Sequence, residues 1–66
     1  MKNNLKVQRA IKNMTQQELA DKVGVSRQTI NALEGGKYVP STVLSLKIAR
    51  VFGKYLEEIF FLEEDD

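Results

Sequence analysis

The chain has 66 residues with a net charge of +1, of which 42% are hydrophobic, and it contains no cysteine and no histidine. That length allows one domain, residues 1–66, with its core expected from residues 5–60. The composition excludes a disulfide and leaves only carboxylates as metal ligands, so we expect no metal and no cofactor. No apolar run is long enough to span a membrane and no signal-peptide pattern opens the chain, which favours a soluble, cytoplasmic protein.

A chain of this length has little core with which to stabilise itself. It buries only about 60% of the surface that its unfolded form exposes. Since neither a disulfide nor a histidine- or cysteine-based metal site is available, oligomerisation is the expected source of further stability.

The charges are distributed unevenly along the chain. Residues 1–54 contain all ten lysines and arginines against three acids, whereas residues 55–66 contain six acids and no base. The body is therefore a candidate partner for a polyanion, and the acidic tail, residues 63–66, should lie away from it. On charge alone, a solvated surface with an acidic end explains the pattern equally well.

The first element expected is a helix that ends near Asn13. Asn3 or Asn4 can cap its start, and Asn13 suits the left-handed position that follows a helix. Met14 should then pack as the apolar residue that precedes the next cap.

Residues 16–35 have the pattern of two short helices joined by a tight turn. Thr15 caps the first helix, with Glu18 three residues later to complete a capping box. Gly24 ends that helix because a left-handed residue is expected there, and Ser26 caps the second. This arrangement is a helix-turn-helix.

A longer helix and a short one complete the chain. Ser41, after a loop rich in turn residues, caps a helix that runs to Phe52, and Gly53 ends it. The stripe expected to face the core comprises Leu44, Leu46, Ile48, Ala49, Val51 and Phe52.

Five short helices with short loops predict an all-α domain. A last helix carries Leu56, Ile59 and Phe60, and no strand-like alternation occurs before residue 59. The predicted core is Leu5, Met14, Leu19, Val23, Val25, Ile30, Leu33, Leu44, Ile48, Phe52, Leu56 and Ile59.

The second helix of the motif carries a polar face suited to the major groove. On a helical wheel centred on Ile30, Gln28 lies opposite the buried stripe and Thr29 and Asn31 lie on its flanks. Gln can pair with adenine N6/N7 and Arg27 with guanine O6/N7. For any single residue a plain solvent-exposed face is as good an interpretation, but the set inside this motif favours DNA reading.

Phosphate contacts are expected on both sides of that face. Gln16 and Gln17 open the first helix of the motif, where unpaired backbone N–H groups can bind a phosphate and the side chains can add hydrogen bonds. Lys37 and Tyr38, in the loop after the second helix, can hold a phosphate on the other side.

Arg9 and Glu34 each lie on an otherwise apolar stripe. Charges on buried faces usually pair, so we expect these two to form an ion pair that joins the first and third helices. Their role would be structural.

From Leu5 to Phe60 the chain resembles the Cro/phage-repressor-type (XRE-like) helix-turn-helix family. The residues that carry the resemblance are Leu5-Lys6, Arg9, Met14 to Ala20, Val23 to Ser26, Thr29-Ile30, Leu33-Glu34, Gly36-Lys37, Pro40-Ser41 and Lys47 to Ala49. Gln8 and Tyr55 depart from the family pattern, at positions that bear on packing.

The resemblance implies a five-helix repressor-type domain, of prokaryotic or phage type, that binds operator DNA as a homodimer. It also implies a buried Arg–Glu pair and DNA contacts in and beside the motif. The contacts expected from the resemblance and the helical wheel together are Gln16, Gln17, Ser26, Arg27, Gln28, Thr29, Asn31, Lys37 and Tyr38.

Apolar side chains crowd the end of the chain, beside a tail that cannot be buried. We expect Ile59, Phe61 and Leu62 to contribute to a two-fold interface, with Phe61 and Leu62 as a short strand that pairs with the N-terminal residues or with a second copy. A frayed C-terminus is the alternative. A dimer predicts an inverted repeat of half-sites about 34 Å apart.

Two other functions are possible for a chain of this length and composition. An enzyme is not expected, because the chain has no nucleophile–base pair, no glycine-rich phosphate loop and too little length to enclose a pocket. A protein-interaction or antitoxin-like module would keep the fold with little DNA specificity, but the basic body and the polar face favour double-stranded DNA as the partner.

Overall fold

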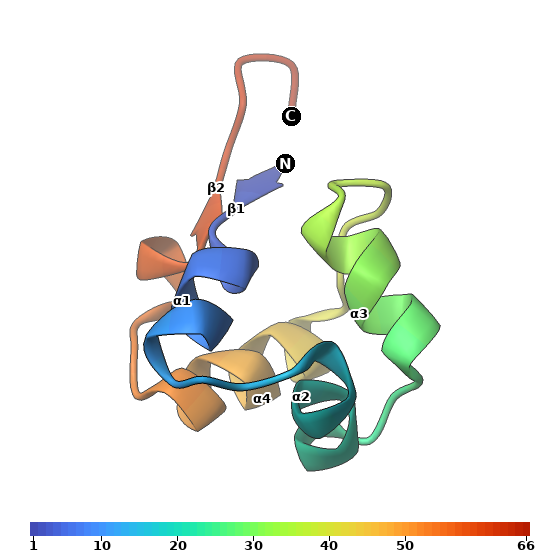
Figure 1. Cartoon of the computed structure of the whole chain (residues 1–66). Helices are drawn as coiled ribbons and strands as arrows, with labels where there is room; N and C mark the ends of the chain where they lie inside the picture. The colour runs from blue at the N-terminus through green and yellow to red at the C-terminus, as the bar shows by residue number, and fades with distance from the viewer.

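The computed structural model describes all 66 residues as four α-helices, one 3-10 helix and a two-stranded sheet (Figure 1). The elements in chain order are β1 (Lys2–Asn3), α1 (Leu5–Ile11), α2 (Gln16–Val23), α3 (Arg27–Glu34), α4 (Thr42–Phe52), the 3-10 helix η1 (Leu56–Glu58) and β2 (Phe60–Phe61). None of the helices is long and apolar enough to cross a membrane.

Side-chain caps place the starts of α2, α3 and α4. Thr15, Ser26 and Ser41 each accept a hydrogen bond from the backbone N–H three residues later. The Glu18 carboxylate in turn accepts a hydrogen bond from the Thr15 N–H at 3.0 Å, which completes the capping box expected from the sequence. These caps satisfy N–H groups that no helical carbonyl can reach.

Left-handed residues end three of the helices. Gly24 (φ 76°) follows α2 and Gly53 (φ 63°) follows α4. Asn13 (φ 51°) follows α1, and the N–H of Met14 donates to the Arg9 carbonyl at 2.9 Å in the bond pattern of a Schellman motif. The sequence thus indicated the ends correctly, although α1 stops at Ile11.

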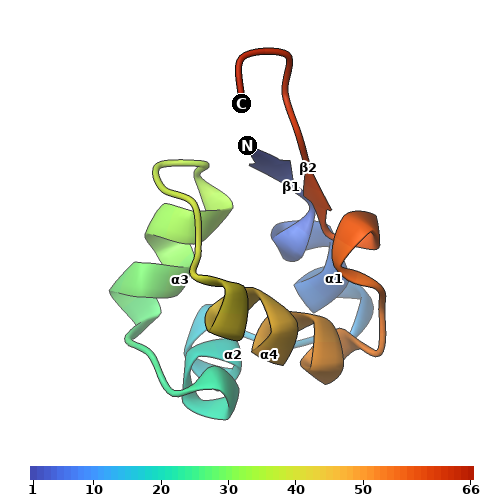
Figure 2. The same ribbon diagram turned by 180° about the vertical axis from the view of Figure 1, so that it is seen from behind.

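The two ends of the chain meet in the small sheet, which corrects the predicted last helix. β1 pairs antiparallel with β2, with Lys2 opposite Phe61 and Asn3 opposite Phe60. Only the single 3-10 turn of η1 remains where a fifth helix was expected, because the residues after Ile59 are extended to pair with β1. Both views show the two termini on the same side of the molecule (Figures 1 and 2).

The core lies between α1, α2, α3 and α4 and under the small sheet. Its members are Leu5, Leu19, Ala20, Val23, Ile30, Leu33, Ile48, Ala49, Phe52, Ile59 and Phe60. Met14, Val25, Leu44 and Leu56, which we expected in the core, are partly buried at its edge.

One residue of the expected α4 stripe was placed wrongly. Leu46 is 54% exposed, whereas Ser45 beside it is buried. The Ser45 hydroxyl donates to the Ser41 carbonyl at 2.8 Å, so this buried polar group has a partner. Ser45, Ile48, Ala49 and Phe52 define the face of α4 that packs on the core.

Candidate nucleic-acid interface

The outer side of α3 is not covered by any other element, as the two opposite views show (Figures 1 and 2). Ile30 and Leu33 face inward and are buried, whereas Arg27, Gln28 and Asn31 are exposed. The latter three lie one helical turn apart or less, so they form one continuous polar surface, which we call the α3 face.

Two of the expected contact residues are engaged in starting the helix. The Ser26 hydroxyl accepts from the Thr29 N–H at 3.1 Å and lies 3.0 Å from the Thr29 hydroxyl. Their oxygens are therefore committed to the cap of α3. The residues of the α3 face whose side chains make no hydrogen bond inside the protein are Arg27 and Gln28.

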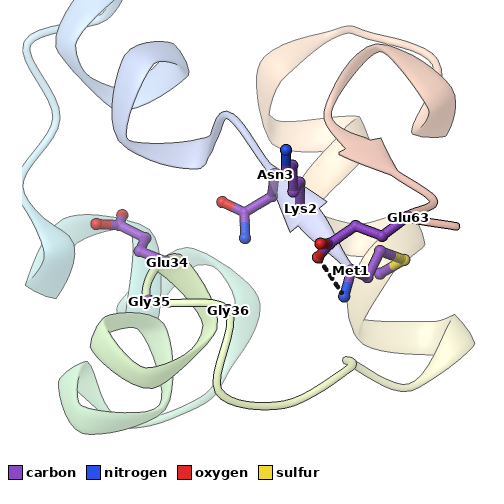
Figure 3. A pocket seen from close by; sticks show the side chains of 7 residues that line it. All are labelled: Met1, Lys2, Asn3, Glu34, Gly35, Gly36 and Glu63. Carbon is purple, nitrogen blue, oxygen red and sulfur yellow. Dashed lines mark ion pairs between the residues drawn. The ribbon is translucent and has the colours of Figure 1, made fainter. Parts of the chain in front are cut away.

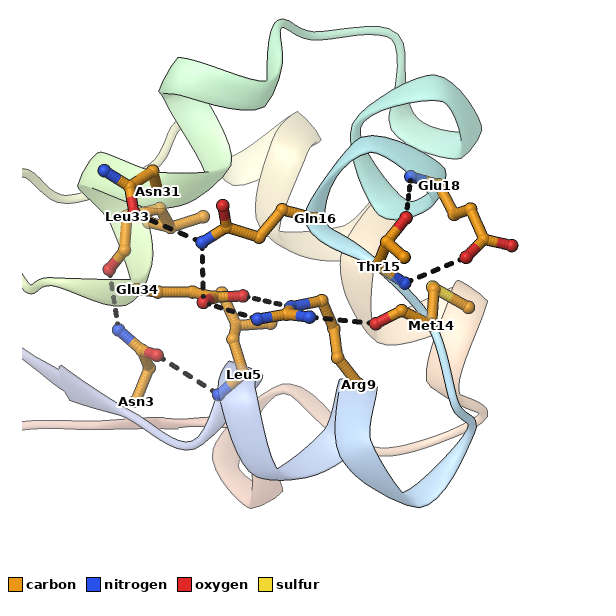
Figure 4. Close-up of polar contacts among 10 residues, drawn as sticks. All are labelled: Asn3, Leu5, Arg9, Met14, Thr15, Gln16, Glu18, Asn31, Leu33 and Glu34. Atoms are coloured by element: carbon orange, nitrogen blue, oxygen red, sulfur yellow. Dashed lines mark hydrogen bonds and ion pairs between the residues drawn. The ribbon is translucent and has the colours of Figure 1, made fainter.

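The buried ion pair expected from the sequence is present and holds α3 against α1. The Arg9 Nε and Nη2 atoms donate to the two carboxylate oxygens of Glu34, the second at 2.9 Å, and Nη1 donates to the Met14 carbonyl at 2.8 Å (Figure 4). The side chains are only 14% and 8% exposed. A bidentate interaction of this kind fixes the relative orientation of the two side chains as well as pairing their charges.

The charge states of this pair follow from its surroundings. Burial would raise the pKa of Glu34, but hydrogen bonds from Arg9 and Gln16, with the charges of Arg9 and Lys6, outweigh it and hold the pKa below its ordinary value. The hydrogen bond to Glu34 raises the pKa of Arg9. Both groups are ionised at neutral pH.

The two glutamines at the start of α2 do not behave alike. Gln17 Nε2 donates to Asp21 at 2.8 Å on the same helix. Gln16 Nε2 reaches across to α3, where it donates to Glu34 Oε1 at 3.1 Å and to Asn31 Oδ1 at 3.2 Å. Because this amide nitrogen has two hydrogens, Gln16 has no side-chain donor left for a phosphate. The backbone N–H groups at the start of α2 remain suited to one.

Lys37 and Tyr38 lie in the loop after α3, and both are exposed. The N–H of Lys37 donates to the Ala32 carbonyl at 3.1 Å, which folds the loop back onto the end of α3. The Gly36 backbone is left-handed (φ 70°) and permits that turn. The loop that carries the two side chains therefore begins next to the last turn of α3.

Asn3 is a positioning residue that the sequence indicated only as a possible helix cap. Its Oδ1 accepts from the Leu5 N–H at 3.1 Å, and its Nδ2 donates to the Leu33 carbonyl at 2.9 Å. One side chain thus joins β1, α1 and the end of α3. The contact with Leu33 spans thirty residues, so no local pattern could reveal it.

A polar depression of about 320 Å³ opens beside this contact (Figure 3). It is lined by Met1, Lys2, Asn3, Glu34, Gly35, Gly36 and Glu63. Glu63 lies 3.3 Å from the N-terminal ammonium group. The acidic tail therefore begins at the depression that Glu34, Gly35 and Gly36 line at the end of α3. No group of three or more acidic side chains is arranged to hold a metal ion.

The chain is similar throughout its length to proteins described as transcriptional regulators. A family model described as helix-turn-helix matches residues 5–59. An uncharacterized HTH-type transcriptional regulator of Methanocaldococcus jannaschii is 58% identical over 66 residues, which is the whole of both chains. A second, from Archaeoglobus fulgidus, is 53% identical over all of this chain and 93% of its own. The regulator YgzD of Bacillus subtilis, also uncharacterized, is 47% identical over the whole of both chains.

Proposed function

Because this chain belongs to the Cro/phage-repressor-type (XRE-like) helix-turn-helix family of DNA-binding transcriptional regulators, we propose that it is a repressor that binds an inverted-repeat operator through the major groove as a homodimer. The family is not enzymatic. The observation that carries the proposal is the α3 face, because a rigid helix presents exposed Arg27, Gln28 and Asn31 on an otherwise uncovered side of the molecule.

The chemistry of that face matches base edges. Arg27, in the first turn of α3, can donate two hydrogen bonds to guanine O6 and N7, and Gln28 can pair with adenine N6 and N7. First-turn residues of a recognition helix are the ones that reach bases most directly. Sequence reading is therefore assigned to Arg27, Gln28 and Asn31.

Backbone contacts would hold the helix in register with the groove. The N–H groups that open α2 at Gln16 and Gln17 can bind one phosphate, and Lys37 with Tyr38 can bind another. These contacts add affinity without reading sequence, and they make binding sensitive to salt.

The homodimer is proposed on the apolar end of the chain. Ile59 is fully buried, so it supports the core and has no surface to offer a partner. Leu62 is 81% and Phe61 40% exposed. Because β2 already pairs with β1 of the same chain, a second copy would pack against the exposed Phe61 and Leu62 side chains. A two-fold axis there predicts half-sites about 34 Å apart in an inverted repeat.

Binding to random duplex at low salt, followed by selection of preferred sequences, tests the proposal. We expect a selected site with two-fold symmetry and an affinity that falls steeply as salt rises. Gln28→Ala should relax the base preference at one position. Lys37→Gln should weaken binding to all duplexes alike and lower the slope of log affinity against log salt concentration by about 1.

Lys54→Gln is the matched control for Lys37→Gln. Lys54 follows α4 and is exposed, and that end of α4 lies far from α3 in both views (Figures 1 and 2). It should leave the salt slope unchanged. If the parent bound no duplex at low salt, the protein-interaction or antitoxin-like role would replace the proposal.

A further inference from the structure

Four side chains form an unbroken series of hydrogen bonds from the interior to the α3 face (Figure 4). Arg9 Nη2 donates to Glu34 Oε1 at 2.9 Å, and Gln16 Nε2 donates to the same carboxylate oxygen at 3.1 Å. The second hydrogen on Gln16 Nε2 is directed to Asn31 Oδ1, 3.2 Å away. The series begins at a buried guanidinium and ends at an exposed amide.

The direction of each bond in this series is fixed by chemistry. An ionised carboxylate can only accept, so the Gln16 atom that faces Glu34 must be the amide nitrogen. That nitrogen has no lone pair to offer Asn31, so the Asn31 atom that faces it must be the carbonyl oxygen. The Arg9–Glu34 pair therefore determines the orientation of both amides.

As a result, the Asn31 amide has its oxygen directed at Gln16 and only its nitrogen free of a partner. Its Nδ2 group points away from Gln16 in Figure 4 and has no hydrogen bond inside the protein. It lies one turn after Arg27 on the exposed side of α3. Arg27 and Gln28, by contrast, make no side-chain hydrogen bond that would preset their orientation.

We propose that Gln16 is a positioning residue that fixes Asn31 as a hydrogen-bond donor toward DNA, so that Asn31 selects guanine over adenine at one position of the site. This inference rests on the proposed function, because it names what one residue of the α3 face reads.

The base preference follows from donor and acceptor positions in the major groove. A freely rotating asparagine pairs with adenine by accepting from N6 and donating to N7. Because Asn31 Oδ1 is directed at Gln16 on α2, it is not turned outward as this pairing requires. Guanine presents two neighbouring acceptors, O6 and N7, which suit an outward NH2 group.

Site selection with Gln16→Met tests the inference. Methionine has similar length but no donor, so Asn31 is released while the helices stay packed. We expect the parent to prefer guanine over adenine about tenfold at one position in each half-site, and the variant to accept both within about twofold. Preferences at the other positions should not change.

Asn31→Asp provides a second variant at an exposed position. Its carboxylate can still accept from Gln16 and would present an acceptor to the groove, so the preference should move from guanine to cytosine, which offers the N4 donor. Its affinity should fall at all sites because it adds a negative charge near phosphates.

Gln17→Met is the matched control, since Gln17 is the same residue type at the same helix start but bonds to Asp21. It should leave every base preference as in the parent, whatever its overall affinity. Side-chain 15N relaxation of Asn31 in the DNA-free protein should show greater mobility in Gln16→Met and not in Gln17→Met.

The outcomes separate the two proposals. A parent that selects a site whose preferences Gln16→Met leaves intact would overturn the positioning role and keep the proposed function. A parent that binds duplex without any base preference would overturn both. Circular dichroism confirms that each variant is folded before its site is selected.

Discussion

The Arg9–Glu34 pair is a buried contact between α1 and the end of α3. Its two side chains are almost covered, and every carboxylate oxygen of Glu34 has a donor. Buried charges are tolerated only when they are paired and hydrogen-bonded in this way. Because the pair joins α1 to the end of α3, it fixes the position of the α3 face as well as neutralising its own charges.

Loss of one partner should therefore be costly. Arg9→Met leaves the Glu34 carboxylate buried without its cation, and we expect a loss of about 3–5 kcal/mol in the free energy of unfolding. Urea denaturation followed by circular dichroism measures this. Arg50→Met, which changes an exposed arginine, is the matched control and should cost much less. Equal stability of Arg9→Met and the parent would show that the pair contributes nothing.

The same pair predicts that the free energy of unfolding depends on pH. Since the pKa of folded Glu34 lies below its ordinary value of 4.5, the unfolded chain binds more protons between those two values. The stabilisation from Glu34 is thus complete above about pH 4.5 and is lost as the pH falls through the lowered pKa.

The difference in melting temperature between the parent and Glu34→Gln isolates this effect from the other carboxylates. The parent should melt at a higher temperature near neutral pH. The difference in melting temperature should narrow as the pH falls below about 4.5. A gap that stays constant with pH would mean that Glu34 does not titrate differently in the folded protein.

At the level of elements, local chemistry in the sequence accounts for where most helices start and stop. Thr15, Ser26 and Ser41 cap as their types and spacing predict. Gly24 is left-handed as expected, and Gly53 ends α4 as expected. These features depend on bonds within three or four residues, which is why reading the sequence alone places them.

Features that depend on distant partners were not predictable in the same way. A strand of two residues has no alternation to detect. The pairing of β1 with β2 was therefore expected only as one of two possible partners for a short strand at the apolar end of the chain. The direction of the Gln16 side chain depends on Asn31 and Glu34, fifteen and eighteen residues away. The phosphate contact expected of its side chain was reasonable locally, but both amide hydrogens are directed to Glu34 and Asn31.

The turn between α2 and α3 offers a clean test of backbone strain. A Cβ at Gly24 would meet nothing within 4 Å, so the only cost of Gly24→Ala is the left-handed backbone at φ 76°, about 1–2 kcal/mol. Gly35 has φ −77°, and a Cβ there would make ordinary contacts no closer than 3.5 Å.

Gly35→Ala is accordingly the matched control. It should stabilise the protein by about 0.4–1 kcal/mol, because alanine restricts the unfolded chain without straining the folded one. Thermal and urea melts of the two variants give opposite signs if this is correct. Similar destabilisation by both would point to a role of the glycines other than φ.

For the whole molecule, the small core makes association with a second copy an attractive source of stability. Sedimentation equilibrium at tens of micromolar protein should show a dimer for the parent and a monomer for Leu62→Glu, because a charge in the proposed apolar interface could not be buried without a partner. Leu46→Glu changes another exposed leucine, on α4, and should remain dimeric. A parent protein that stays monomeric at high micromolar concentration would contradict the proposed homodimer.

Dimethyl sulfate interference on the selected duplex tests most directly whether α3 reads the major groove. The reagent methylates guanine N7 in the major groove and adenine N3 in the minor groove, and these are the edges that distinguish the two modes of binding. We expect guanine N7 methylation within each half-site to block binding of the parent, and adenine N3 methylation there to have little effect. Interference from adenine N3 alone, with every guanine N7 position tolerant, would contradict recognition by Arg27, Gln28 and Asn31.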